Sequence, residues 1–170
     1  MTEPPPTIIY TDPRYRNGQL VNESALMDEW LSRRYPGVRS LGRLRLGPTS
    51  ATVNGVSLTP AEQAMLSVLN WYADAIVLSP FEQLIVECKV VAKPSAVGEV
   101  LFYRQLLYAT PAIQALLPLT VQPVVLFGED DPVVGSFARS LGVRVEIYTP
   151  QWLPDYLARV QFRGRGTRTG

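Results

Sequence analysis

Two apolar runs separated by a five-residue segment constrain the fold of this chain most strongly. The runs are residues 72–78 and 84–91, and the segment between them is "SPFEQ", residues 79–83. Pro80 suits the second position of a turn, so the pattern predicts two antiparallel strands joined by a hairpin turn. The second run is unusual for a buried strand because Glu87 and Lys89 interrupt it.

The register of this hairpin brings charged residues together. A turn centred between Pro80 and Phe81 places Asp74 opposite Glu87, because both residues are equidistant from that centre. Side chains alternate between the faces of a strand, so Lys89 shares a face with Glu87. Directly opposite residues also share a face, with Cβ atoms about 4.5–5.5 Å apart. We therefore expect two carboxylates and an ammonium group to converge, and a register shift of one residue would turn Asp74 away.

The residue types that are missing exclude several kinds of chemistry. The chain contains no histidine, which excludes Ser-His-Asp and Cys-His catalysis, histidine-ligated zinc and nucleases whose base is a histidine. Its single cysteine, Cys88, excludes an internal disulfide and a multi-cysteine zinc site, and agrees with a reducing compartment. Hydrolytic chemistry would therefore depend on carboxylates, lysine and a hard metal ion.

Size and charge indicate one globular domain with no general attraction to nucleic acid. The 170 residues are 46% hydrophobic and carry a net charge of +1, so a nucleic-acid partner would have to bind a local patch. The only lysines are Lys89 and Lys93. No apolar run approaches the roughly 20 residues of a membrane span, and the N-terminus lacks the features of a signal peptide. We expect a cytoplasmic protein that has no membrane partner.

The remaining segments predict an α/β fold with a mixed sheet, because hairpins join the early strands and helices join the later ones. We expect a helix from an N-cap at Asn22 to Pro36-Gly37 and a hairpin at Asn54-Gly55. A helix from about 95 to 109 takes Ser95 as its N-cap. The other predicted elements are a strand at 38–46, a short helix at 60–70, a strand at 121–128, a helix at 132–142, a strand at 143–148 and a short helix at 151–160.

This pattern divides the chain into three parts. Residues 1–21 are rich in proline and polar groups and are expected to form an extended arm. Residues 22–160 would form the α/β domain. Residues 161–170 are basic and rich in glycine, which predicts a flexible tail.

A divalent cation would explain the charges at the hairpin. Unpaired buried ions cost several kcal/mol each, and adjacent carboxylates repel. Mg²⁺ commonly binds one or two carboxylates together with waters and a substrate phosphate oxygen. Lys89 would then be placed to orient or deprotonate the attacking water and to offset the charge that develops on the phosphorus.

Asp74, twelve further residues and then Glu87-Cys88-Lys89 resemble the motif of the PD-(D/E)XK nuclease superfamily. The order of predicted elements resembles its restriction-endonuclease-like αβββαβ core, a central mixed sheet flanked by helices. The resemblance implies a DNA nuclease of prokaryotic or phage origin that hydrolyses phosphodiester bonds through a Mg²⁺-activated water, with Mn²⁺ as a substitute. It implies that Asp74, Glu87 and the Cys88 backbone carbonyl bind the metal, and that Lys89 is the catalytic lysine. Ala73 replaces the proline of the motif, which is a common variation.

The resemblance extends to two helices. The family often adds an acidic residue from its first helix, for which Glu23 is the candidate, because it shares a helical face with Leu26 and Trp30. RecB-like members carry Gln-x-x-x-Tyr on the helix after the lysine, and the matching positions here are Glu99 and Tyr103. Tyr103 would contact the substrate. Glu99 replaces an amide with a carboxylate, which makes it a further candidate metal ligand.

Each of these residues also has an ordinary structural explanation. Glu-x-Lys on an exposed strand is a solvated pair worth under about 1 kcal/mol. Glu23 suits the start of a helix through the helix dipole, and Tyr103 suits the edge of a core. Glu99 suits a first-turn charge, and Cys88 suits a small core residue.

A second function remains open at this stage. The chain could be a catalytically silent nuclease-fold protein that serves as an assembly component of a phage particle or of a defence or repair complex. Its small size, its near-neutral charge and the two ends expected to lack fixed structure agree with that role. A homodimer or a larger protein assembly is compatible with either function.

Overall fold

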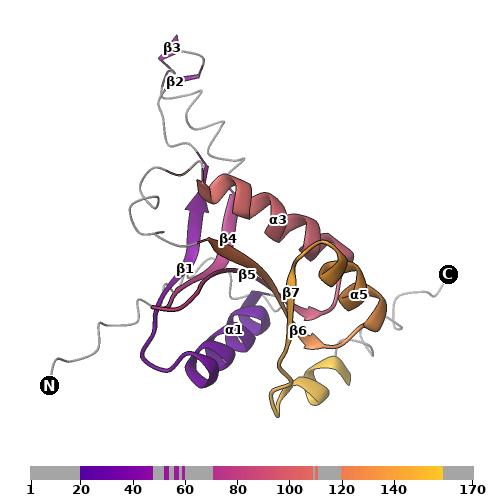
Figure 1. The fold of residues 1–170 in the computed structure, drawn as a ribbon. Coiled ribbons are helices and arrows are strands. Elements are labelled where there is room, and N and C mark those ends of the chain that lie inside the picture. The colour runs from indigo at the N-terminus through magenta and orange to yellow at the C-terminus, as the bar shows by residue number, and fades with distance from the viewer. Residues whose placement is uncertain are drawn as a thin grey trace, which may run out of the picture.

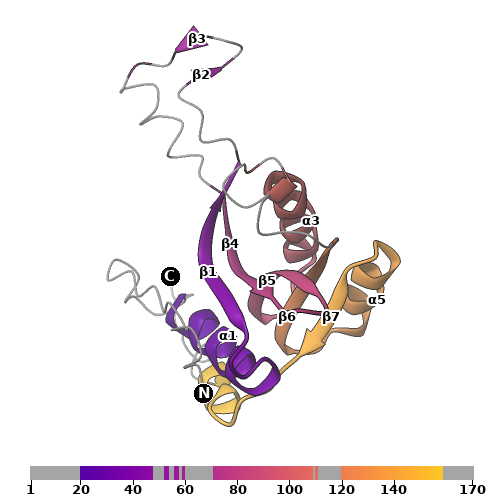
Figure 2. The ribbon, with the colours of Figure 1, turned by 60° about the vertical axis from the view of Figure 1, so that its left-hand side comes forward.

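The protein folds around a five-stranded mixed β-sheet with helices on both faces (Figures 1 and 2). The computed structural model describes residues 20–47, 52–53, 56–57, 59, 71–108, 110 and 120–158. Strands in the sheet follow the order β1-β4-β5-β6-β7. The pairs β1–β4 and β4–β5 are antiparallel, whereas β5–β6 and β6–β7 are parallel. The predicted α/β class with a mixed sheet is therefore confirmed.

Helices connect the parallel strands, because a parallel pair needs a crossover connection that is long enough to return the chain to the same end of the sheet. In chain order the described elements are α1 (Leu20–Arg34), β1 (Arg39–Leu46), β2 (Thr52–Val53), β3 (Val56–Ser57), β4 (Trp71–Leu78), β5 (Gln83–Val91), α3 (Pro94–Tyr108), β6 (Val121–Glu129), α5 (Pro132–Ser140) and β7 (Arg144–Ile147). Strands β2 and β3 form a separate antiparallel pair, at the hairpin that the sequence predicts. Residues 153–158 are also helical.

The sheet separates two cores. On one face, α1 packs Leu26, Met27 and Trp30 against the strands in what we call the α1-side core. On the other face, α3 packs Val97, Val100 and Leu107 in the α3-side core, to which α5 also contributes. Figure 2 shows α1 on one side of the sheet and both α3 and α5 on the other. Residues 84–86 and 124–127 are fully buried, because strands covered on both faces expose neither side.

The hairpin register agrees with the sequence prediction. Strands β4 and β5 pair Leu78 with Gln83 and continue to Ala75 with Val86. Each of these pairs is equidistant from a centre between Pro80 and Phe81. Asp74 and Glu87 are the next residues along the two strands.

Two helix starts differ from the prediction. Helix α1 begins at Leu20, so Asn22 lies inside it and is not the N-cap. Helix α3 begins at Pro94, so Ser95 is not an N-cap either. Proline is favoured at the first helical position, where no N–H donor is needed. The helix predicted at 60–70, residues 1–19 of the predicted arm and the tail at 161–170 lie outside the described residues. None of the described helices is long and apolar enough to cross a bilayer.

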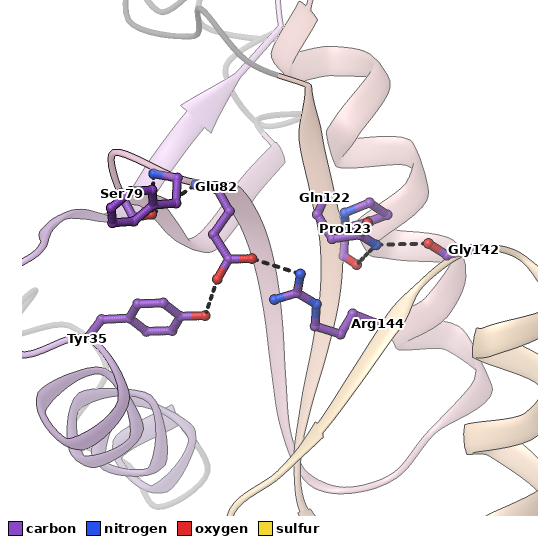
Figure 3. A network of polar contacts seen from close by, with 8 residues as sticks. Tyr35, Ser79, Glu82, Gln122, Pro123, Gly142 and Arg144 are labelled. Atoms are coloured by element: carbon purple, nitrogen blue, oxygen red, sulfur yellow. Dashed lines mark hydrogen bonds and ion pairs between the residues drawn. The ribbon is translucent and has the colours of Figure 1, made fainter.

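A polar network fixes the turn between β4 and β5 (Figure 3). The Ser79 hydroxyl oxygen accepts hydrogen bonds from the backbone N–H groups of Phe81 and Glu82. The Glu82 carboxylate accepts from the Tyr35 hydroxyl at 3.0 Å and from the Arg144 guanidinium at 2.8 Å. Arg144 holds the pKa of Glu82 below its ordinary value. Burial and the hydrogen bond to Glu82 raise the pKa of Tyr35 to about 12. The turn that sets the register is thus tied to both α1 and β7.

A second carboxylate ties α1 to the chain that follows β7. Glu29 accepts hydrogen bonds from the Tyr148 hydroxyl at 3.1 Å and from the Trp152 indole N–H at 2.7 Å. The guanidinium of Arg33 lies 5.6 Å from the centre of the Tyr148 ring, within the range of a cation–π contact. These contacts hold α1 in place over the sheet, with its first turn beside β5.

Candidate active site

In β4, the regular alternation of side chains between the two faces of the sheet is interrupted at Asp74. Ala75 and Val77 belong to the α1-side core, whereas Ile76 and Ala73 both belong to the α3-side core. Residues 73 and 76 of a regular strand would point to opposite faces. The ladder between β4 and β5 also ends at Ala75 and Val86. The break therefore falls at Asp74, and β4 diverges from β5 at this residue.

The Asp74 side chain takes over the backbone pairing that the divergence interrupts. Its Oδ2 atom accepts a hydrogen bond from the backbone N–H of Cys88 at 2.9 Å. Within a strand, the N–H and C=O of one residue point to the same side. The Cys88 carbonyl therefore also faces β4, toward the gap that holds the Asp74 carboxylate. Oxygens of three residues, the carboxyl groups of Asp74 and Glu87 and the backbone carbonyl of Cys88, therefore lie around the same gap.

Strand β1 has a matching irregularity at Arg43. The ladder pairs Gly42 with Ala75 and then Leu44 with Ala73, and it omits Arg43 and Asp74 between them. Arg43 has a φ of 45°, a left-handed conformation that costs a residue other than glycine roughly 1–2 kcal/mol. Its guanidinium lies 5.6 Å from the centre of the Tyr72 ring, and its charge acts to lower the pKa of Asp74.

Sequence reasoning missed Arg43, although the sequence contains a signal for it. The three leucines of β1 that pack against the α3-side core, Leu41, Leu44 and Leu46, are spaced three and then two residues apart. A regular strand keeps a spacing of two along one face. The three-residue interval therefore marks the irregularity, and Arg43 lies inside it.

Glu87 and Lys89 form a partly buried ion pair at the same gap. Only 3% of Glu87 is exposed, and its Oε1 atom accepts a hydrogen bond from the Lys89 ammonium group. The same ammonium group lies 3.6 Å from Oε2 of Glu99 on α3. Lys89 is thus held between a carboxylate of its own strand and one from the helix.

The protonation equilibria of this group depend on one another. Burial, followed by the charge of Asp74, raises the pKa of Glu87 to about 9. Burial also raises the pKa of Asp74, against the hydrogen bond from Cys88, which acts to lower it. For Lys89, burial acts to lower the pKa, but the carboxylates around it, Glu87 first, outweigh that effect and raise it. Several carboxyl groups therefore compete for one ammonium group.

Glu23 approaches this cluster from α1, on the other face of the sheet. It lies in the first turn of α1, and its backbone carbonyl accepts a hydrogen bond from the Cys88 thiol at 3.5 Å. Burial raises the pKa of its carboxyl group, Lys89 acts to lower it and Asp74 acts to raise it. The structure thus brings Glu23 into the electrostatic neighbourhood of Asp74 and Lys89.

Tyr103 approaches the cluster from α3, one turn after Glu99. It is 8% exposed and belongs to the α3-side core. Burial, followed by the charges of Glu87 and Glu99, raises the pKa of its hydroxyl group to about 12. Glu99 and Tyr103, the two residues of α3 that the sequence singled out, are therefore both close to the carboxylates. Tyr103 nevertheless also has the structural role of a core residue.

Cys88 points away from this group of charges. Its side chain lies in the α1-side core and is 1% exposed. Burial raises the pKa of its thiol well above the ordinary value, so it remains protonated. This agrees with the prediction of a small core residue.

The structure therefore brings together Glu23, Asp74, Glu87, Lys89, Glu99 and Tyr103 around the gap between β4 and β5. No group of three or more His, Cys, Asp or Glu side chains arranged to hold a metal ion occurs among the described residues. Oxygens near the gap come from the neighbouring carboxyl groups of Asp74 and Glu87 and from the Cys88 carbonyl, and the Glu99 carboxyl group lies beside Glu87. Comparisons with family models, with curated proteins and with solved structures find no significant match to this chain.

Proposed function

We propose that the protein is a Mg²⁺-dependent DNA nuclease of the PD-(D/E)XK type. The observation that carries the proposal is the placement of the Asp74 carboxylate beside Glu87 and Lys89, where β4 leaves β5. The described elements also support a restriction-endonuclease-like core, because α1, β1, β4, β5, α3 and β6 follow the order αβββαβ. In this assignment the β2–β3 hairpin is an insertion between the first and second core strands.

The donor atoms at the gap suit Mg²⁺. Two carboxylates and a backbone carbonyl are the hard oxygen ligands that this ion prefers, and waters and a substrate oxygen complete its shell. A cation between Asp74 and Glu87 would also offset the burial and the charge of Asp74, which together raise the pKa of Glu87. When bound, the ion supplies Lewis acidity toward a phosphate oxygen and lowers the pKa of a water. Mn²⁺, which has similar ligand preferences, would substitute for it.

The residues of the chain would divide the remaining tasks. Lys89 carries a fixed positive charge at the site and would stabilise the negative charge that develops on the phosphate in the transition state. Glu99, 3.6 Å from the Lys89 ammonium group, would hold that group in position. Glu99 also lies beside Glu87 and acts to raise the pKa of that carboxyl group, so it would remain a further candidate metal ligand. Glu23 would hold a water at the α1 side of the gap.

A substrate panel tests the proposal. Purified protein is incubated with linear, nicked, branched and single-stranded DNA in Mg²⁺, in Mn²⁺ and in a chelator. We expect cleavage of at least one substrate in either metal, none in the chelator and none by Lys89→Ala. Lys93→Ala is the matched control because it removes the only other lysine, and it should retain cleavage. The proposal is wrong if no substrate is cut, or if Lys89→Ala cuts as the wild type does.

One observation favours the assembly function as a second candidate. Helix α5 and its C-cap expose Val133, Phe137 and Leu141, which are 79%, 46% and 45% exposed. These residues are four apart and lie along one side of the helix. Exposed apolar stripes of this kind occur at protein–protein contacts. Light scattering of the wild type and of Phe137→Glu would test it: an assembly that dissociates in the variant supports this candidate, and a monomeric wild type argues against it.

A further inference from the structure

Exposed aromatic side chains lie next to the candidate active site. Trp71, at the start of β4, is 44% exposed, and Phe102, on α3, is 43% exposed. Their rings meet edge to face, with centroids 5.1 Å apart and an interplanar angle of 86°. We call Trp71, Phe102 and the buried Tyr103 beneath them the aromatic shelf. Large aromatic residues are usually well buried. Two that are nearly half exposed and in mutual contact therefore indicate a candidate ligand-binding surface.

Tyr103 connects the shelf to the carboxylates. Its ring lies 6.4 Å from that of Trp71 and 6.5 Å from that of Phe102. Its hydroxyl group experiences the charges of Glu87, Glu99 and Asp74. A ligand bound to the shelf would therefore lie next to the carboxylates at the gap between β4 and β5.

Positive charge lies at the same end of β4 as the shelf, but on the other face of the sheet. Leu46 is the cross-strand partner of Trp71, and the exposed Arg45 beside it is the partner of Tyr72. The Tyr72 ring is 38% exposed and lies under the guanidinium of Arg43. The shelf thus offers flat apolar surfaces for bases, and the guanidinium groups of Arg43 and Arg45 lie around the same edge of the sheet, on its other face.

From these contacts we propose that the aromatic shelf binds single-stranded DNA by base stacking and guides it to the active site. The inference rests on the proposed nuclease function and names its substrate class. Stacking requires base faces that are open, which a single strand provides and an intact duplex does not. Substrates would thus be single strands, or the unpaired ends and flaps of duplexes.

The test measures binding in the absence of divalent metal, so that it is independent of cleavage. Fluorescence anisotropy in a chelator compares a labelled oligo-dT with a duplex of equal length. We expect tighter binding of oligo-dT, and an increase in its dissociation constant by roughly 5- to 100-fold for Trp71→Ala or Phe102→Ala. Phe81→Ala is the matched control: Phe81 is 92% exposed but lies in the turn at the other end of the hairpin, and its loss should leave binding unchanged.

Several outcomes would overturn this inference. They are equal or tighter binding of the duplex, no measurable binding of oligo-dT, an equal loss in Phe81→Ala, and tighter binding of oligo-U than of oligo-dT. Trp71→Phe keeps a stacking ring and should restore most of the affinity, which separates stacking from a loss of folding. If oligo-dT binds as expected but no substrate is cut in Mg²⁺ or Mn²⁺, the shelf stands and the nuclease function fails. If DNA is cut but the shelf variants bind oligo-dT as tightly as the wild type does, the nuclease function stands and the inference about the shelf fails.

Discussion

Asp74 has two roles that a substitution can separate. Its carboxylate caps the backbone N–H of Cys88, and its negative charge is held beside Glu87 in a buried position where burial raises its pKa. The first role stabilises the fold. The second disfavours the native state, because burial of a charge is costly.

Replacement of Asp74 should therefore give opposite results with asparagine and alanine. Asp74→Asn keeps an oxygen for the Cys88 N–H and removes the charge, so we expect the free energy of unfolding in a chelator to rise, by up to about 2 kcal/mol. Asp74→Ala leaves the Cys88 N–H unpaired and should lower the free energy of unfolding by about 1–3 kcal/mol. Urea denaturation measures both values, and both variants should lose cleavage. An Asp74→Asn protein less stable than the wild type would contradict this account of the site.

At the scale of elements, the turn between β4 and β5 depends on Glu82. Arg144 lowers the pKa of Glu82, so the carboxylate ionises more readily in the native than in the unfolded state. The stabilisation is then present above the ordinary carboxyl pKa of 4.5 and is lost as the pH falls through the lower, folded value. Because this pair is about one-third exposed, with side-chain exposures of 36% and 34%, its contribution is screened by solvent.

Glu82→Gln should therefore lower stability at neutral pH by less than about 1 kcal/mol. The difference from the wild type should shrink as the pH falls below 4.5. Thermal unfolding of both proteins across this pH range measures it. A difference that stays constant or grows on acidification would show that the contribution of Glu82 is not electrostatic.

Glu29 makes a separate prediction for α1 and the segment after β7. Glu29→Ala removes the acceptor of both Tyr148 and Trp152, and we expect a loss of about 1–3 kcal/mol. Hydrogen exchange should become faster in residues 148–158. The exposed neighbour Asp28 provides the control, since Asp28→Ala removes a carboxylate of the same helix without these bonds. Equal exchange in the two variants would contradict the role of Glu29.

Across the whole molecule, the parts of the fold that follow from local rules could be predicted from the sequence. Hydrophobic alternation and the proline turn gave the β4–β5 register, and thus the approach of Asp74 to Glu87. The same rules could not predict the break at Asp74 and Arg43, because a period of two assumes a regular strand. The anchoring of α1 through Glu29 also depends on residues more than 100 positions apart, which no local pattern specifies.

The residue at which a helix begins was less predictable from the sequence than the presence of the helix. Asn22 and Ser95 are good cap residues, but α1 and α3 begin before them. Cap preferences are worth about 1 kcal/mol, less than the apolar burial that fixes where a helix lies. The structure places Glu23, Glu87 and Glu99, from three separate elements, near Lys89. Strand periodicity pointed to Glu87, whereas Glu23 and Glu99 came from the family resemblance, and the roles of all three stay predictions.

The central claim is that Asp74, Glu87 and Lys89 form a metal-dependent phosphodiesterase site. The most direct test is the single-turnover rate of cleavage in Mg²⁺ on the best substrate of the panel, for wild type, Lys89→Ala and Lys93→Ala. The account predicts that Lys89→Ala slows cleavage by about 100-fold or more in protein that is still folded at the assay temperature, while Lys93→Ala stays within a few-fold of wild type. Equal rates for wild type and Lys89→Ala, or cleavage that persists in a chelator, would contradict it.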